Sequence, residues 1–394
     1  MPEGVTTNFK MVLFFTFCVT LILWVYIGYP FVLLLLSRLT HGQPVQRRSI
    51  TPPVTLIISA YNEARSIRKK IENSLALDYP HEQLEVIVVS DSSDDDTDKI
   101  VREYANRGVR LARLEKRSGK TVGLNTAVPQ AKGEIVIFSD ANAMYHRQAV
   151  RQLVRNFADP TVGCVTGESR YEVEENAADS TASENLYWRY ELALKKMETQ
   201  VGSLVGGDGA IYAIRKTLFR PMRPEDLSDF VNPLQIVAQG YRNVYEAEAF
   251  SFEHGAESFE KEFHRKVRIV NRAWRGLWRV RQVLNPFRFG FYTMQVVSHK
   301  LLRWLIPVFM VGAFIANFFL LNIGKLHQAI FTLQIMFYVL ALIGWLQSQR
   351  PAISKLFYVP YYFCLVNYAS LLGIISNYRG EKFAVWNTVR EDKA

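Results

Sequence analysis

The chain has 394 residues, of which 49% are hydrophobic and 21% charged. These proportions exclude a disordered chain, a collagen-like chain and a small disulfide scaffold. Lysine and arginine exceed aspartate and glutamate by ten, which favours an anionic partner such as a phosphate, a lipid headgroup or a nucleic acid. The three cysteines all lie in apolar stretches, so no disulfide framework is predicted.

The two ends of the chain are much more apolar than its middle. Residues 11–36 carry no charge over 26 positions, and about 20 apolar residues suffice to cross a bilayer as a helix. Apolar runs near 305–323, 326–346 and 357–376 predict three more spans. Buried core helices are the less favoured alternative, because the middle of the chain has apolar strands of its own. The sequence thus predicts an integral membrane protein.

The charges on either side of the first span predict its orientation. Lys10 precedes the span, whereas Arg38, Arg47 and Arg48 follow it. The positive-inside rule therefore places the middle of the chain in the cytoplasm, with the plasma (inner) membrane as the expected location. Four crossings would put both termini outside, while the basic residues after Ser376 favour the inside. The side of the C-terminus stays open, and one C-terminal segment could be re-entrant.

Short β-branched runs alternate with polar helical stretches from residue 54 onward. Buried strands are predicted at 54–59, 85–90, 109–114, 134–139 and 162–167, and helices near 64–77, 95–107, 120–131 and 147–158. This alternation predicts a mainly parallel sheet with helices on both faces. Ligands of such sheets bind beyond the carboxyl ends of the strands.

Polar residues gather at the ends of three predicted strands. These clusters lie at 59–63, 90–98 and 139–142. Each alone could be an ordinary turn, but Asp140-Ala141-Asn142 offers two oxygen ligands suited to Mg²⁺ or Mn²⁺. Such a cation can clamp a diphosphate. Asp91 could accept a hydrogen bond from a base or ribose, and Lys120 could bind phosphate.

Two common nucleotide-binding motifs are missing. No G-x-G-x-x-G follows the first predicted strand, which disfavours a dinucleotide-binding domain. Gly119-Lys120-Thr121 resembles the end of a Walker A motif, but the required upstream glycine would fall at Leu114. The polar strand ends therefore need another explanation.

The order of these motifs resembles glycosyltransferase family 2 over roughly residues 52–300. Its membrane-embedded polysaccharide synthase branch (cellulose, hyaluronan and poly-N-acetylglucosamine synthases) is the most similar, because apolar spans flank the domain. The resemblance implies a GT-A fold with a mainly parallel, nucleotide-sugar-binding α/β sheet. It also implies Asp229 as the catalytic base and a Mg²⁺ or Mn²⁺ ion on Asp140 and Asn142. The substrate-binding residues that it implies are Tyr61, Glu63, Asp91, Lys120, Asp140, Gly206, Gly207, Arg265 and Arg268.

Three positions depart from the family's usual motifs. The D-x-D motif reads Asp140-Ala141-Asn142, with an amide in place of a carboxylate. The Thr-Glu-Asp motif lies eleven residues before a Gly-Tyr-Arg, and counting back from Gly240 selects Asp229 rather than Asp226. The Q-x-x-R-W motif reads Arg265-Lys266-Val267-Arg268-Ile269. The missing tryptophan leaves open whether the chain makes the contacts of processive synthases to a growing glycan.

Residues 259–288 hold nine lysines and arginines and two glutamates. At helical spacing, aromatic and aliphatic residues share one side and arginines occupy the other, which predicts an amphipathic helix in the membrane interface. For Arg272 to Arg279 an anionic-lipid anchor is at least as favoured as catalysis, whereas Arg265 and Arg268 match the family motif. Nucleic-acid binding is disfavoured, because the basic cluster adjoins a span.

We therefore expect a membrane-bound inverting glycosyltransferase that uses a UDP-sugar and a glycan or lipid-linked acceptor. Single-sugar transfer to a lipid-linked acceptor and a non-enzymatic membrane scaffold are the alternatives. Membrane lipids are expected partners, and a homo-oligomer or an export partner stays open, since four spans are few for a channel. The expected parts are a transmembrane helix (1–37), a cytoplasmic GT-A domain (52–258), basic interface helices (259–300), C-terminal transmembrane helices (305–376) and a tail (377–394).

Overall fold

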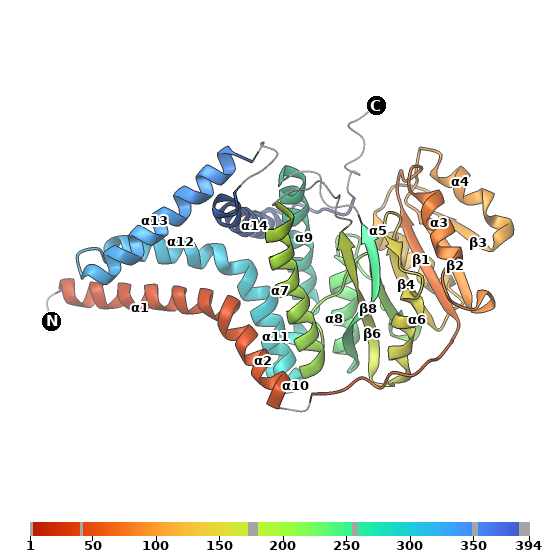
Figure 1. The fold of residues 1–394 in the computed structure, drawn as a ribbon, viewed down its shortest axis with the longest axis horizontal. Coiled ribbons are helices and arrows are strands. Elements are labelled where there is room, and N and C mark those ends of the chain that lie inside the picture. Colours follow the sequence, from red (N-terminus) through yellow and green to blue (C-terminus); the bar gives the residue numbers. More distant parts are fainter. Residues whose placement is uncertain (1–2, 40–41, 172–179, 254–258, 349–353, 386–394) are drawn as a thin grey trace.

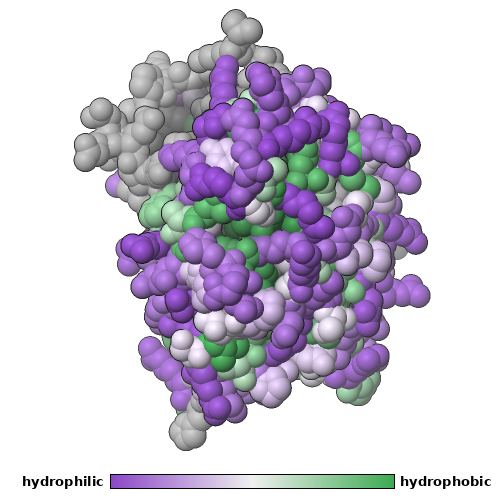
Figure 2. Space-filling model, turned by 90° about the vertical axis from the view of Figure 1, so that its right-hand side faces the viewer, coloured by the Kyte–Doolittle hydropathy of each residue, from purple (hydrophilic) through white to green (hydrophobic). Residues whose placement is uncertain are grey.

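The computed structural model describes residues 3–39, 42–171, 180–253, 259–348 and 354–385 of the chain. Long helices form a bundle at one end, and an α/β domain lies at the other (Figure 1). Helices α7 (Ser180–Val201) and α9 (Phe259–Arg279) lie between these two parts. The face of the domain turned away from the bundle is mostly hydrophilic (Figure 2). The apolar ends and the polar middle of the sequence thus form separate parts of the molecule.

Among the described residues, eight strands form the sheet of the α/β domain, in the order β3-β2-β1-β4-β7-β6-β8-β5. Their bounds are β1 Val54–Ala60, β2 Leu84–Ser90, β3 Val109–Arg113, β4 Ile135–Asp140, β5 Met144–Tyr145, β6 Val162–Tyr171, β7 Ile211–Arg215 and β8 Arg242–Glu253. All five strands predicted from the sequence are present, with β6 longer than predicted.

The sheet is mixed, but six of its eight strands run in one direction, so the prediction of a mainly parallel sheet holds, with β7 and β5 as the two reversed strands. Strands β3, β2, β1 and β4 run parallel, and β6 and β8 are parallel to each other. Strand β5 runs antiparallel to β8, and β7 runs antiparallel to both β4 and β6. The cause is the loop before β7, which reaches the sheet at the carboxyl end of β4, where Ile211 pairs with Ser139. From there β7 can only run back along β4. This path brings Gly206 and Gly207 to the edge of the sheet at the carboxyl end of β4.

Helices cover both faces of the sheet. They are α3 (Ile67–Leu75), α4 (Thr97–Glu103), α5 (Lys120–Gln130), α6 (Ala149–Val154) and α8 (Ser228–Ala238). Ile135 and Ile137 of β4 belong to one hydrophobic core, and Val136 and Phe138 belong to the other, because successive side chains of a strand point to opposite faces. Burial on both faces explains why these strands are continuous apolar runs in the sequence. Short 3-10 helices lie at His81–Gln83, Ala105–Arg107, Arg155–Ala158, Lys216–Leu218 and Arg281–Leu284.

Within the described ranges, four helices are long and apolar enough to cross a membrane, judged by length and composition. These candidate spans are Thr7–Leu39, Phe291–Phe319, Lys325–Leu346 and Lys355–Tyr378. The first span consists of α1 (Glu3–Leu23), a π-helical segment (Trp24–Gly28) and α2 (Tyr29–Leu39). The second consists of α11 (Phe291–Val296), a π-helical segment (Val297–Leu302) and α12 (Arg303–Phe319). The third and fourth spans are α13 and α14. Large apolar side chains such as Phe31, Val311 and Leu342 are exposed on them, as contact with lipid requires. The four apolar runs of the sequence are therefore all helical.

Helix α9 connects the bundle to the α/β domain. Its apolar residues Val270, Trp274 and Leu277 are buried, and the helix packs on both α14 and α8. On its basic side, Arg272 is buried and donates to the hydroxyl of Thr121 at 3.0 Å. The arginine therefore contacts the α/β domain, and the location of α9 in a membrane interface stays a prediction.

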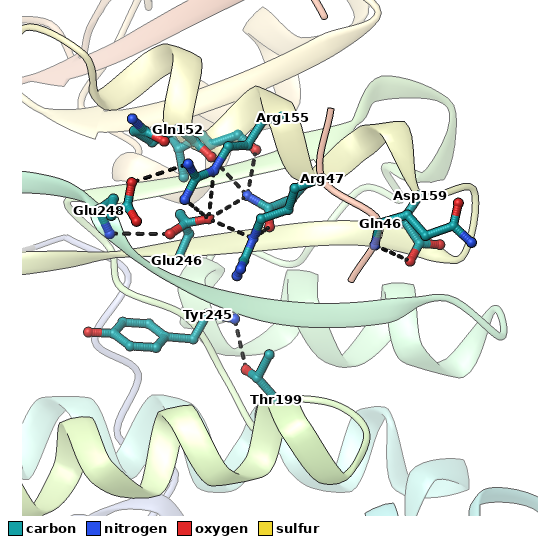
Figure 3. Close-up of polar contacts among 11 residues, drawn as sticks. Gln46, Arg47, Gln152, Arg155, Asp159, Thr199, Tyr245, Glu246 and Glu248 are labelled. Carbon is teal, nitrogen blue, oxygen red and sulfur yellow. Dashed lines mark hydrogen bonds and ion pairs between the residues drawn. The ribbon is translucent and has the colours of Figure 1, made fainter. Parts of the chain in front are cut away.

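The segment between the first span and β1 lies along the edge of the α/β domain. Arg47 pairs with Glu246 of β8 at 3.1 Å, and Arg155 pairs with the same carboxylate at 3.0 Å (Figure 3). The amide of Gln46 donates to Asp159 at 3.2 Å. Because Glu246 is only 3% exposed, loss of this pairing would leave a buried carboxylate without a cationic partner. These contacts hold the linker against the domain.

Candidate active site

The polar loops that follow β1, β2 and β4 meet at one edge of the sheet, as predicted. The backbone amide of Asn62 donates to the hydroxyl of Ser93 at 3.1 Å, and the backbone amide of Ala141 donates to the carbonyl oxygen of Ser59 at 3.2 Å. Asn62 has a φ of 50°, a left-handed conformation that asparagine adopts more readily than most residues. This edge is the candidate active site.

Tyr61 and Glu63 lie in the first of these loops. The guanidinium of Arg117 lies 3.8 Å from the centre of the Tyr61 ring. The carboxylate of Glu63 accepts a hydrogen bond from the hydroxyl of Ser66, and its carbonyl oxygen accepts one from the amide of Ile67 at 2.8 Å. Glu63 thus helps to start α3. Substrate binding by Tyr61 and Glu63 stays a prediction.

Asp91, at the end of β2, holds the loop that precedes α5. Its carboxylate accepts hydrogen bonds from the amide of Ser118 at 2.7 Å and from the amide of Gly119 at 2.9 Å. Gly119 has a φ of +92°, and a β-carbon there would collide with the carbonyl oxygen of Ala384. Asp91 therefore has a structural role beside Lys120, whereas its contact with a base or ribose stays a prediction.

Lys120 lies between two acids of the site. Its ammonium pairs with Asp140 at the end of β4 and donates to the carbonyl oxygen of Gly209 at 2.9 Å. A β-carbon on Gly209 would lie 3.3 Å from a carboxylate oxygen of Asp229 and 3.7 Å from the ammonium of Lys120. The structure therefore brings Lys120, Asp140 and Asp229 together, although they are far apart in the sequence.

Asp229 lies in the first turn of α8 and is half-buried. Burial raises the pKa of Asp229 above its ordinary value. The charge of Lys120 lowers this pKa, and the charge of Asp208 raises it further. A β-carbon on Gly207 would lie 2.8 Å from the carbonyl oxygen of Asp229, and Gly206 has a φ of +86°. Both glycines are therefore needed to bring their loop against α8.

The neighbouring acid, Asp226, has different surroundings. It has no exposed surface, pairs with Arg279 of α9, and accepts a hydrogen bond from the amide of Arg223 at 2.8 Å. Its carboxylate is therefore closed to a substrate, whereas that of Asp229 is partly open.

Two further carboxylates belong to the site and are absent from the sequence-based set. Glu253 ends β8, and burial together with the charges of Asp140 and Asp208 raises its pKa to about 8. Asp208 accepts a hydrogen bond from the hydroxyl of Ser169 at 2.7 Å and lies 3.8 Å from Lys195. The sequence pattern that could have identified Glu253 is an acid at the end of an apolar strand. Asp208, between glycines in a loop, gave no comparable signal.

The two arginines of the predicted family motif differ in their partners. Arg265 forms two bonds with the carboxylate of Glu262, at 2.7 and 3.0 Å. Burial, together with neighbouring arginines, lowers the pKa of Arg268 to about 10, and the charges of Asp140 and Asp229 oppose this shift. Arg268 is therefore near the carboxylates of the site, where it can face an anionic substrate.

The turn of Asp140 and Asn142 is the predicted divalent-cation site. Within the described ranges, no three His, Cys, Asp or Glu side chains are arranged as ready-made metal ligands. The donor set nevertheless suits a hard cation, because the carboxylates of Asp140 and Asp208 both lie near that of Glu253, whose pKa is raised first by burial and then by these two charges. Mg²⁺ commonly takes one or two protein carboxylates and completes its coordination with substrate phosphates and water.

Comparisons with known proteins show what part of this chain resembles. Residues 55–220 match the family model described as Glycosyl transferase family 2. Poly-beta-1,6-N-acetyl-D-glucosamine synthase of Staphylococcus epidermidis is 30% identical over 143 residues, which cover 36% of this chain and 32% of that protein. The synthase of the same name from Staphylococcus aureus (strain COL) is 32% identical over 119 residues, covering 30% of this chain and 28% of that protein. The matched stretch thus spans about a third of these relatives.

A solved structure extends the comparison to the fold. The mannosyltransferase PcManGT from Pyrobaculum calidifontis, in complex with GDP-Man and Mn²⁺, superposes with a TM-score of 0.70. The two chains are 22% identical, and the superposition covers 94% of this chain and 100% of that one. The mixed α/β sheet is therefore a GT-A type fold. The chain carries a glycosyltransferase family 2 domain over residues 55–220, and the predicted resemblance to the polysaccharide synthase branch is confirmed.

Proposed function

We propose that the chain is a membrane-bound inverting glycosyltransferase that moves a sugar from a UDP-sugar to a growing polysaccharide or glycan. The observation that carries this proposal is the location of Asp229. Its partly open carboxylate shares a site with Lys120 and Asp140, beyond the carboxyl ends of parallel strands, where α/β sheets bind their ligands. The candidate spans support a membrane beside this domain, and the charges around the first span favour a cytoplasmic site.

Lys120 and Arg268 are the proposed groups for the donor's diphosphate. Both are cations near the two acids of the site. Lys120 pairs with Asp140 and lowers the pKa of Asp229, while the charges of Asp140 and Asp229 act on the pKa of Arg268. Negative charge grows on the diphosphate as it leaves the sugar, so cations fixed near it stabilise the transition state. Asp140 and Asn142, with Glu253, are the residues that would hold Mg²⁺ or Mn²⁺. The cation would add further positive charge to the leaving group.

Asp229 is the proposed general base. An acceptor hydroxyl attacks the anomeric carbon of the donor sugar, the new carbon–oxygen bond forms, and the bond to the diphosphate breaks. The hydroxyl proton passes to the Asp229 carboxylate, whose burial raises its pKa and strengthens it as a base. A single displacement of this kind inverts the anomeric carbon, and the UDP leaves with the electron pair of the broken bond.

The test is turnover of a panel of nucleotide sugars by the purified full-length protein in detergent. UDP-N-acetylglucosamine, UDP-glucose, UDP-glucuronate and GDP-mannose are supplied with Mg²⁺ or Mn²⁺, and released nucleotide and product length are measured. We expect release of UDP from one UDP-sugar and its loss in excess EDTA. A long product supports polysaccharide synthesis, while a single added sugar supports transfer to a lipid-linked acceptor. Absence of release from every donor would support a non-enzymatic scaffold and contradict the proposal.

A further inference from the structure

Lys70 of α3 is a buried cation that the proposed mechanism does not use. Its side chain has no exposed surface, and within the described part of the chain it forms no ion pair. Its ammonium donates instead to the carbonyl oxygen of Ala143. Lysines are almost never fully buried unless they are paired, because an ammonium loses its hydration in the core. The location of Lys70 therefore calls for an explanation beyond packing.

Ala143 belongs to the turn that carries the proposed cation ligands. It follows Asn142 directly, and its backbone amide donates back to the carbonyl oxygen of Asp140 at 3.2 Å, which closes the turn. Ala143 is completely buried, so its carbonyl oxygen needs a donor from within the protein. Lys70 supplies this donor. It thus holds the residue at which the turn of Asp140 and Asn142 closes.

Lys70 also packs on Tyr145, which connects two elements of the site. The ammonium lies 3.9 Å from the centre of the Tyr145 ring, at the distance of a cation–π contact. The hydroxyl of this tyrosine lies 2.9 Å from the carbonyl oxygen of Phe138 in β4 and 3.1 Å from that of Ala210. Ala210 follows Gly209, whose loop lies against Lys120 and the proposed base. Lys70 therefore supports the side chain that joins β4 to this loop.

The acids whose charges act on Lys70 are those of the proposed cation site. Burial lowers the pKa of Lys70 to about 7, and the charges of Asp140 and Glu253 oppose this shift. A salt bridge to either carboxylate would occupy oxygen atoms that a divalent cation needs, whereas a bond to a carbonyl oxygen leaves them available. The contacts of Lys70 with Ala143 and Tyr145 therefore suit a residue that supports the site without blocking it.

We propose that Lys70 is a positioning residue, which fixes the turn of Asp140 and Asn142 in the geometry that a divalent cation requires. It acts through Ala143 and Tyr145 and touches neither the cation nor the sugar. The inference rests on the proposed function, because it takes the cation site at this turn as given. Residues that orient metal ligands without binding the metal commonly affect its affinity as strongly as many ligands do.

The experiment measures UDP binding to the full-length protein in detergent by calorimetry, once with Mn²⁺ and once with EDTA. The ratio of the two affinities reports the cation alone. We expect Lys70→Met to reduce this ratio at least about tenfold, while the affinity in EDTA stays within about twofold of wild type. The unfolding temperature should stay within about 3 °C of wild type, because the lost hydrogen bond to Ala143 is offset by the removal of a buried charge.

A second variant tests the same turn without changing a charge. The side chain of Asn73, on α3, accepts a hydrogen bond from the backbone amide of Tyr145 at 2.8 Å and donates to its carbonyl oxygen at 2.9 Å. Asn73→Ala should therefore reduce the Mn²⁺ ratio in the same direction, by about threefold, and it keeps the inference testable if Lys70→Met folds poorly. Lys69→Met is the matched control, because Lys69 is exposed on the same helix. Its ratio should stay within about twofold of wild type.

Two results would overturn the inference alone. A larger Mn²⁺ ratio in Lys70→Met would mean that Lys70 acts only through its charge, because its loss removes a cation from beside the carboxylates. An unchanged ratio with a lower unfolding temperature would mean that Lys70 only packs the core. If Mn²⁺ does not strengthen UDP binding even in wild type, the cation site of the proposed function is refuted, and the inference fails with it.

Discussion

Arg279 of α9 pairs with Asp226, whose carboxylate is completely buried in front of α8. This contact joins the helix that packs on the bundle to the domain that carries the candidate site. It also separates two acids that lie three residues apart. Asp226 faces Arg279, whereas Asp229 faces Lys120 and the loop of Gly209. The pairing is thus a structural reason to place the base at Asp229.

We expect Arg279→Met to destabilise the protein, because it leaves the buried Asp226 carboxylate without its partner. Breaking a buried pair costs about 3–5 kcal/mol, and we expect about 3 kcal/mol, since Arg279 is 21% exposed. Thermal unfolding in detergent, followed by tryptophan fluorescence, measures the loss. Arg275→Met is the control, because Arg275 lies on the same helix and, in the described part of the chain, donates to the carbonyl oxygen of Glu381, at 3.0 Å, rather than to a carboxylate. Equal effects of the two substitutions would refute a special role for the pair.

Glu253 predicts a pH dependence of stability. Its pKa is raised from 4.5 to about 8 in the folded protein, first by burial and then by Asp140 and Asp208. The folded state therefore binds a proton that the unfolded state releases, and the resulting stability is fully present below pH 4.5. It is lost as the pH rises toward 8. Thermal unfolding between pH 5 and 9 should show this decline, and Glu253→Gln should flatten it. An unchanged slope in Glu253→Gln would contradict this account of the carboxylates.

The same group predicts how a divalent cation affects stability. A cation bound near Asp140 and Glu253 needs ionised carboxylates, so Mn²⁺ should raise the unfolding temperature more at pH 8.5 than at pH 6. Glu253→Gln should reduce this difference. If Mn²⁺ stabilises Glu253→Gln as much as wild type at both pH values, Glu253 is not a ligand.

Sequence patterns could predict the strands and the spans but not all of the site. Central strands such as β1 and β4 are buried on both faces, so they appear as apolar runs with polar ends. The approach of Glu253 to Asp140 depends instead on the pairing of β5 with β8, in which Tyr145 lies opposite Ser251. No local pattern encodes contacts between segments that lie so far apart.

The periodicity of the basic helix α9 also predicts only part of its surroundings. The spacing correctly separates an apolar side of α9 from an arginine side. The spacing cannot show whether the arginines face lipid or protein, because an amphipathic helix can pack either on a membrane surface or on a protein domain. Arg272 contacts Thr121, and Arg279 contacts Asp226, so these two positions are occupied by the α/β domain.

Asp91→Ala should weaken UDP binding at least tenfold in calorimetry while the protein stays folded. The carboxylate accepts hydrogen bonds from Ser118 and Gly119, and without it the loop before Lys120 loses its fixed shape. Asp94→Ala is the control, because Asp94 is an exposed acid of the same polar loop. If both variants bind UDP like wild type, the acidic loop after β2 has no part in the donor site.

Lys120→Met should change the pH profile of sugar transfer. A general base must be ionised, so the rate rises with pH through the pKa of Asp229, which burial raises above 3.8. Lys120 lowers that pKa, so its loss should move the rise to higher pH. The profile of kcat is measured between pH 4.5 and 9. A lower rate with no displacement of the profile would mean that Lys120 acts only on the donor.

The most direct test of the account compares sugar transfer by Asp229→Asn and Asp226→Asn at saturating donor, with UDP affinity measured in parallel. Asparagine keeps the size of the side chain and its capacity to cap a helix, so a capping residue would tolerate the change with a loss of up to about 1 kcal/mol. The account predicts that Asp229→Asn loses at least 10²-fold in transfer rate with UDP affinity near wild type. It predicts that the folded fraction of Asp226→Asn keeps most of its activity. If Asp229→Asn stays active and folded Asp226→Asn does not, Asp226 is the base and the assignment is wrong.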